Sequence, residues 1–177
     1  NAIDALIALH RLPVDAAVPP GVKPYDMPRL LEEVNRIYTW YLPLLGAPAL
    51  PADALAEYER IWRGILPLAW TAPASLVLFD YHIDNLLLLE GREGMRACGI
   101  LDFQDAVVGP VTYDLMSLLE DARRDLSPDL VDTMRARYLA AFPALDRDAF
   151  DASWAVMAAQ RHLRGIKSEE HTSELQS

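Results

Sequence analysis

The sequence predicts a mostly helical α+β fold with one short β-hairpin. Apolar residues recur at the helical spacings of three and four over much of the chain. Near its middle, three short apolar runs at 75–79, 86–89 and 98–101 are bounded by glycine or charged residues, which favours strands over helices. With 52% hydrophobic residues among 177, the chain can bury one sizeable core.

The helices are expected from apolar periodicity and from the residues that begin and end them. Asp26 and Ser127 are suited to N-terminal caps, and a proline follows each of them within the first turn. The proline-rich connector 13–24 has no regular pattern, and His10 is interpreted as a helix-face residue rather than a ligand. In chain order, the expected helices cover residues 2–12, 26–41, 52–66, 111–123, 128–141 and about 147–164.

The second helix carries an aromatic cluster and a carboxylate with two possible roles each. Tyr38, Trp40 and Tyr41 could stack on a sugar, but their helical spacing favours an aromatic core. Glu33 on the same segment could face a substrate cleft, although we expect it on a solvated helix face.

Three oxygen-bearing side chains are expected to converge at one end of a small sheet. The run 75–79 leads to Asp80 and a short polar loop, and Asn85 precedes the hairpin formed by 86–89 and 98–101. The return strand ends on Asp102, which brings it back toward Asn85. This set suits phosphoryl transfer from a magnesium nucleotide, with Asp80 as the base and Asn85 and Asp102 as magnesium ligands.

The same residues carry a family resemblance. Asp80-x₄-Asn85, a hairpin and Asp102-Phe103-Gln104 resemble the catalytic loop and metal-binding Asp of the aminoglycoside phosphotransferase and choline kinase family, whose fold is protein-kinase-like. The segments FDYHIDNLLLL and GILDFQDAVVGPVTYDLMSLLEDARRD are similar in particular to bacterial kinases of the anomeric hydroxyl of N-acetylmuramate and N-acetylglucosamine. The resemblance covers about residues 1–166, and Phe79 stands where these families usually carry Arg or Gly.

The resemblance implies a fold and a reaction. Residues 1–167 would form the large, C-terminal lobe of the phosphotransferase fold, truncated at both ends. The small lobe would be missing, because the sequence supplies neither a Gly-rich phosphate loop nor the strand Lys and helix Glu pair. The cofactors would be ATP and Mg²⁺, and the γ-phosphate would pass to an amino-sugar hydroxyl in cell-wall recycling. The fragment alone would be inactive or nearly so.

Other residues are assigned supporting or binding roles. By resemblance, His82 braces the catalytic loop, although a proton shuttle or metal ligand is an alternative. Asp114 is expected to be partly buried, and the resemblance implies that it bonds backbone groups of that loop. The possible substrate-binding residues are Asp84, Gln104, Asp105, Glu33 and Arg161. For Asp84 a turn-forming role is the alternative, and for Arg161 an exposed helix end.

Three alternative functions are compatible with the presence of Asp80, Asn85 and Asp102. An antibiotic-modifying phosphotransferase would differ only in its acceptor, and a choline-type kinase would need an aromatic cage for a quaternary ammonium. From another class, a catalytically silent kinase-like binding module would keep the fold without turnover.

The composition limits which binding partners and which cellular compartment are expected. The net charge of −10 argues against nucleic acid, and no apolar run reaches the roughly 18 residues that span a bilayer. The single Cys98 cannot form an intramolecular disulfide, which is compatible with the cytoplasm. The sequence gives no expectation for oligomeric state. Residues 168–177 resemble a translated sequencing adapter, so we treat them as a non-native tail.

Overall fold

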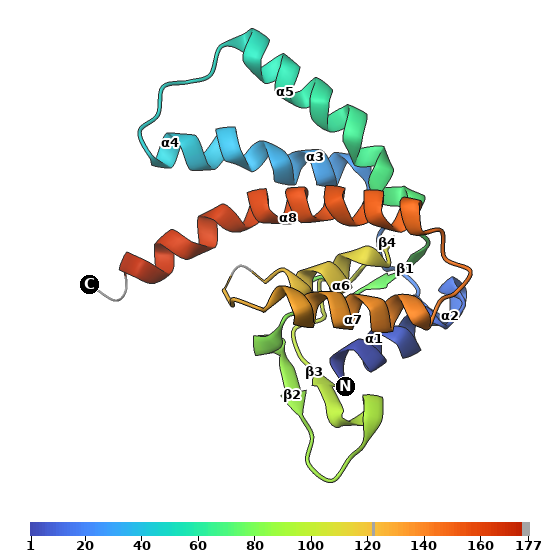
Figure 1. Ribbon diagram of the computed structural model, residues 1–177. Coiled ribbons are helices and arrows are strands. Elements are labelled where there is room, and N and C mark those ends of the chain that lie inside the picture. Colours follow the sequence, from blue (N-terminus) through green and yellow to red (C-terminus); the bar gives the residue numbers. More distant parts are fainter. Residues whose placement is uncertain (122, 175–177) are drawn as a thin grey trace.

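The fold is mostly helical, with two small antiparallel sheets (Figure 1). The structure is a computed structural model that describes residues 1–121 and 123–174, with side chains described through Arg164. The α-helices are α1 (Ala2–His10), α2 (Val14–Ala17), α3 (Met27–Arg36), α4 (Leu42–Leu44), α5 (Ala52–Ile65), α6 (Thr112–Leu119), α7 (Pro128–Ala140) and α8 (Arg147–Glu174).

Helix α8 organises the packing. It crosses the molecule between α3, α4 and α5 on one side and α6 and α7 on the other (Figure 1), and it packs on α3, on α6 and on the 3₁₀ segment η2 (Leu66–Thr71). Its buried face carries Phe150, Trp154 and Met157 into the main apolar core. The predicted helix over about 147–164 is therefore confirmed, and its backbone continues to Glu174. The side chains of the predicted non-native tail, 168–177, lie outside the described residues.

Capping residues act where the sequence predicts them. The Asp26 side chain accepts a hydrogen bond from the Arg29 N–H (3.1 Å), and Ser127 caps α7 in the same way. Helix α3 then continues through a π-helical turn, η1 (Ile37–Tyr41), into α4. The expected helix 111–123 is shorter than predicted, because α6 ends at Leu119. There the Asp121 carboxylate accepts from the backbone N–H of Arg123, which competes with helix continuation.

The strands form two sheets rather than one. The predicted hairpin is confirmed as β2 (Leu86–Leu88) and β3 (Cys98–Ile100), with Leu86 opposite Ile100. The first run forms β1 (Ala74–Val77), which pairs antiparallel with β4 (Val107–Pro110).

The sequence analysis predicted no strand over Val107–Pro110, where the structure has β4. Strand β4 forms there because it pairs with segments that are distant in the sequence, which no local pattern indicates. Pro110 lies opposite Ala74 of β1, and Val108 also exchanges backbone hydrogen bonds with Lys23 and Tyr25. Within the part of the chain that the structure describes, no helix has the length and apolar character to cross a membrane.

His10 lies at the contact between α1 and α7. Its Nδ1 is 2.7 Å from the Tyr138 hydroxyl, and the two rings meet edge to face at 5.8 Å. Burial lowers the pKa of His10 to about 4, because the interior does not solvate an imidazolium ion.

This lowered pKa predicts a loss of stability in acid. Below about pH 6.5 His10 is protonated in the unfolded state, but in the folded state it stays neutral down to about pH 4. The free energy of unfolding therefore decreases as the pH falls through this interval. Over that interval wild type should lose about 3 kcal/mol relative to His10→Gln, which does not titrate. Denaturant unfolding of both proteins from pH 7 to 4 measures this difference. Parallel stability curves would contradict the prediction.

Candidate active site

A buried carboxylate fixes the start of the predicted catalytic loop, residues 78–85. Asp114 lies in the first turn of α6 and is fully buried. Its Oδ2 accepts the Leu78 N–H (2.6 Å) and its Oδ1 accepts the Phe79 N–H (3.0 Å). Burial raises the pKa of Asp114 to about 7, while the two N–H donors act in the opposite direction. The chain that leaves β1 is thus held at the residues that precede Asp80.

Backbone strain is concentrated at this site. Phe79 has φ of 74° and Asp102 has φ of 58°, and no other non-glycine residue in the described structure has a positive φ. For a bulky residue such as Phe79 this conformation costs about 1–3 kcal/mol and needs support from its surroundings. The Phe79 ring has that support, because it stacks on Tyr113 at 5.3 Å and meets Tyr25 edge to face at 5.4 Å.

Backbone and amide contacts connect the three predicted catalytic positions. The Asn85 Nδ2 group donates to the Asp80 carbonyl (3.0 Å), and the Asn85 carbonyl accepts from the Leu101 N–H (2.9 Å). Leu101 immediately precedes Asp102, so the end of the hairpin lies beside Asn85. Asp80, Asn85 and Asp102 therefore belong to one connected segment of the surface.

The His82 ring lies under the loop. Its Nε2 is 3.2 Å from the Asn85 Nδ2, which is a geometry suited to bracing the amide. Burial lowers the pKa of His82, and the nearby charges of Arg123 and Arg161 lower it further. A neutral ring can accept from the amide nitrogen and leaves the Asn85 Oδ1 to face a cation.

Asp102 and the residues after it are exposed. The Gln104 side chain donates to the Asp102 carboxylate, and Asp105 is exposed beside them. The role of Asp84 goes beyond shaping the turn, because its carboxylate forms ion pairs with Arg124 (2.9 Å) and Arg123 (3.8 Å).

Glu33 is where the structure departs furthest from the sequence analysis. It is only 4% exposed, so the expected solvated face is wrong. Its Oε2 accepts from the Tyr25 hydroxyl (2.6 Å) and from Gln160 Nε2 (2.7 Å), and its Oε1 accepts from Arg29 Nε (3.3 Å). Arg164 Nη1 lies 3.8 Å from Oε2. Four donors surround this carboxylate, which leaves it no open approach for a substrate.

Sequence reasoning missed Arg164. Its Nη2 lies 3.5 Å from Asp80 Oδ1, so the C-terminal helix reaches the predicted base directly. Gln160 is fully buried one turn earlier, and Arg161 is only partly buried, so this end of α8 is not the exposed helix end that we favoured. A signal was present: Met157, Gln160 and Arg164 continue the apolar stripe of α8 at helical spacing, which indicates that the two polar residues face the interior.

Two hollows differ in their relation to this site. One, of about 260 Å³, lies between η1 and α8 and is lined by Trp40, Tyr41 and Arg164 among others. Trp40 is 60% exposed, and Tyr38 and Tyr41 are only partly buried, although Tyr38 packs edge to face on Tyr58 at 5.6 Å. The expected aromatic core at this cluster is therefore wrong, because η1 contributes no buried residue.

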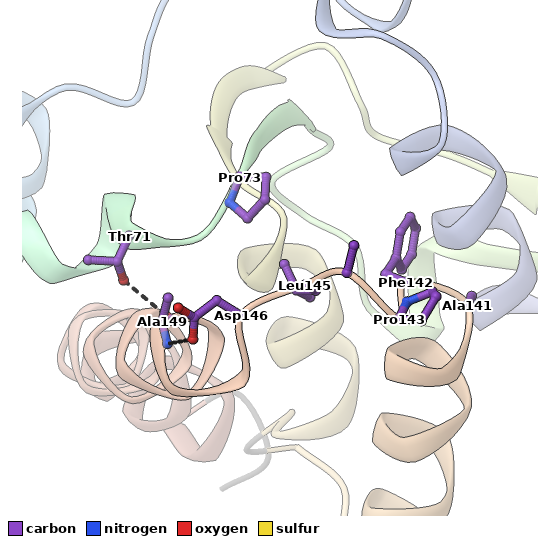
Figure 2. A pocket seen from close by; sticks show the side chains of 9 residues that line it. Thr71, Pro73, Ala141, Phe142, Pro143, Leu145, Asp146 and Ala149 are labelled. Carbon is purple, nitrogen blue, oxygen red and sulfur yellow. Dashed lines mark hydrogen bonds between the residues drawn. The ribbon is translucent and has the colours of Figure 1, made fainter.

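The other hollow, of about 470 Å³, lies between η2 and the α7–α8 loop (Figure 2). Apolar side chains such as Phe142, Pro143 and Leu145 dominate its lining, and none of the predicted site residues contributes to it. The smaller hollow is therefore connected to the candidate active site through Arg164, which lines it and contacts Asp80.

The chain is similar to a protein-family model and to several curated proteins. A family model described as "Phosphotransferase enzyme family" matches residues 1–152. An N-acetylmuramate/N-acetylglucosamine kinase of Caulobacter vibrioides is 38% identical over 92% of this chain and 46% of its own length. A protein of the same name from Pseudomonas putida is 35% identical over 94% of this chain and 48% of its own length. The chain thus spans about half the length of these curated relatives.

Solved structures confirm the predicted fold class. The GDP complex of wild-type aminoglycoside 2'-phosphotransferase-IIIa superposes with a TM-score of 0.55 at 18% identity, over 98% of this chain and 60% of that one. The GDP complex of a mutant of the same enzyme gives a TM-score of 0.56 at 19% identity, over 97% of this chain and 57% of that one. At such identities the likeness shows the fold alone.

The Asp114 contacts predict a large stability effect. Asp114→Ala would leave two buried N–H donors without an acceptor, and each such group costs about 1–3 kcal/mol. We expect the free energy of unfolding to fall by about 3–4 kcal/mol, measured by denaturant titration. Ser117→Ala is the matched control, because Ser117 is buried on the same helix and its hydroxyl has no partner among the described residues. Equal losses in the two variants would contradict the assignment.

Proposed function

The chain belongs to the phosphotransferase enzyme family, and we propose that the protein carrying it transfers the γ-phosphate of ATP to a hydroxyl of an amino sugar. The acceptor we propose is the anomeric hydroxyl of N-acetylmuramate or N-acetylglucosamine. Relatives with these sugars in their names are 31–38% identical to the chain. The observation that carries the proposal is the connected arrangement of Asp80, Asn85 and Asp102 around one loop.

Asp80 is proposed as the base. Its side chain is 31% exposed, so a sugar hydroxyl can reach it. The hydroxyl oxygen forms a bond to the γ-phosphorus, the bond from that phosphorus to the bridging oxygen breaks, and ADP leaves. The hydroxyl proton passes to the Asp80 carboxylate. Because the loop is held at Leu78 and Phe79, the carboxylate is positioned before the substrate arrives.

Asn85 and Asp102 are proposed to hold magnesium. Both offer oxygen donors, which magnesium prefers, and the contacts of the Asn85 side chain use its nitrogen and leave its oxygen for a cation. The part of the chain that the structure describes has no cluster of three or more His, Cys, Asp and Glu side chains suited to a metal. Phosphate and water oxygens would complete the coordination. When bound, magnesium neutralises charge on the β- and γ-phosphates.

The hollow between η1 and α8 is proposed to hold the acceptor. It combines the aromatic side chains of Trp40 and Tyr41 with the charged groups of Glu32 and Arg36, a mixture typical of small-molecule sites. Arg164 lines this hollow and also contacts Asp80, so an occupant would lie close to the base. Asp84, Gln104, Asp105 and Arg161 remain candidates for peripheral contacts. We propose the cytoplasm as the compartment, because the reaction consumes ATP.

The acceptor can be tested with the whole protein. We expect N-acetylmuramate and N-acetylglucosamine to be phosphorylated in the presence of ATP and magnesium, as measured by ADP release and by mass spectrometry of the product. The methyl glycoside of N-acetylglucosamine should not react, since its anomeric oxygen is blocked. Phosphorylation of the glycoside would move the reaction to another hydroxyl. Turnover of an aminoglycoside or of choline alone would replace the sugar assignment, and no turnover would favour a binding module.

The base assignment predicts a specific loss of turnover. Asp80→Asn keeps the shape of the side chain but removes the proton acceptor, so kcat should fall at least about 100-fold. The KM for the sugar should change far less, because the interaction serves the transition state. Asp132→Asn, an exposed carboxylate on α7, is the control and should keep wild-type kcat. Activity of Asp80→Asn within a few-fold of wild type would rule Asp80 out as the base.

A further inference from the structure

Arg164 occupies a position between the proposed base and the buried carboxylate Glu33. We propose that Arg164 is a positioning residue, which holds the Asp80 carboxylate in the orientation that accepts the sugar proton. This inference rests on the proposed function, since it assigns Arg164 a role through Asp80. It adds the C-terminal helix α8 to the machinery of the reaction.

The first support is the geometry of the guanidinium group. Arg164 Nη2 lies 3.5 Å from Asp80 Oδ1, and Nη1 of the same group lies 3.8 Å from Glu33 Oε2. A planar guanidinium that contacts two carboxylates through two different nitrogens has little freedom to rotate. The Arg164 side chain is 18% exposed, so solvent does not fully screen these contacts.

The second support is the balance of charge around Glu33. Arg29 already donates to Glu33 Oε1 and can neutralise it, while Tyr25 and Gln160 supply neutral donors to Oε2. Two cations, Arg29 and Arg164, therefore lie beside two anions, Glu33 and Asp80. Arg164 is the cation of this group that reaches Asp80. Its charge is thus available to the proposed base rather than consumed by Glu33.

The third support is the aromatic ring beneath the guanidinium. The Arg164 Cζ lies 4.3 Å from the centroid of the Phe79 ring, and the Arg29 Cζ lies 4.6 Å from it. Such contacts favour a cation over the ring face. The positive φ of Phe79 directs its side chain to this place, and Tyr113 stacks against it. The strained residue before Asp80 therefore supports the cation that contacts Asp80.

Steady-state kinetics of the whole protein, with ATP, magnesium and N-acetylglucosamine, test the proposal. Arg164→Gln should lower kcat about 10- to 100-fold, because a misplaced catalytic group costs rate rather than binding. The KM values for sugar and ATP should stay within about threefold. Arg164→Lys retains the charge without the planar fork and should keep at least about five times the kcat of Arg164→Gln. A raised sugar KM at unchanged kcat would overturn the proposal, since Arg164 would then be an acceptor ligand.

A matched control is available on α7. Arg135 also pairs with a carboxylate, that of Asp151, and its Cζ lies 5.1 Å from the centroid of the Trp154 ring. Arg135→Gln thus loses the same kinds of contact away from the catalytic loop, and its kcat should stay within about twofold of wild type. A loss equal to that of Arg164→Gln would overturn the proposal. Thermal unfolding of each variant shows whether it is folded.

If Arg164→Gln does not fold, Glu33→Gln provides the second variant. It keeps the shape of the side chain and leaves Arg164 in place, but removes the charge that holds the far side of the guanidinium. Its kcat should fall about fivefold or more with little change in KM. Wild-type kcat in a folded Glu33→Gln protein would overturn the proposal.

A double variant separates this inference from the proposed function. If Arg164 acts through the carboxylate, Arg164→Gln should cause no loss beyond about twofold in the Asp80→Asn background. A full additional loss there would mean that Arg164 acts independently, and would overturn the inference. An inactive Asp80→Asn combined with a fully active Arg164→Gln would overturn only the inference. An active Asp80→Asn would overturn the proposed function and the inference together.

Discussion

The pair of hydrogen bonds from Leu78 and Phe79 to Asp114 determines where the candidate site can form. β1 ends just before these residues, and without an acceptor their buried N–H groups would destabilise the fold. The carboxylate comes from the first turn of α6, which starts two residues after β4. The β1–β4 pairing, the start of α6 and the catalytic loop are therefore one structural unit. This explains why β4, which lies far from Asp80 in the sequence, affects the position of Asp80.

The Glu33 carboxylate has the corresponding role for the helices. It collects donors from α3 and α8 and from the connector before α3, so these segments meet at one buried charge. A buried carboxylate is tolerated only when its hydrogen-bonding capacity is satisfied, and Glu33 meets that condition through Tyr25, Arg29 and Gln160. Arg164 then connects this group to Asp80. The helical layer and the catalytic loop are thus linked by charge as well as by apolar packing.

The sequence predicted the features that local chemistry determines. The Asp26 cap and the β2–β3 hairpin depend on residues a few positions apart, and both were anticipated. The positions of Asp80 and Asn85 before the hairpin and of Asp102 after it also predicted a common site, although the roles of these residues stay predictions. Strand β4 was missed because its partner, β1, lies far away in the sequence. The burial of Glu33 was missed because two of its partners, Gln160 and Arg164, come from the distant helix α8. A local pattern does not show which distant residues supply these partners.

The residue before Asp80 shows how such a distant contact can replace a local one. The families that this chain resembles usually carry Arg or Gly at the position of Phe79, and an arginine there would bring a guanidinium to the loop from within the loop itself. In this chain the guanidinium groups arrive from α3 and α8, and both lie over the Phe79 ring. An aromatic side chain at this position is therefore compatible with a cation beside the base. The positive charge beside Asp80 comes from Arg164, so the geometry of the loop depends on the packing of α8.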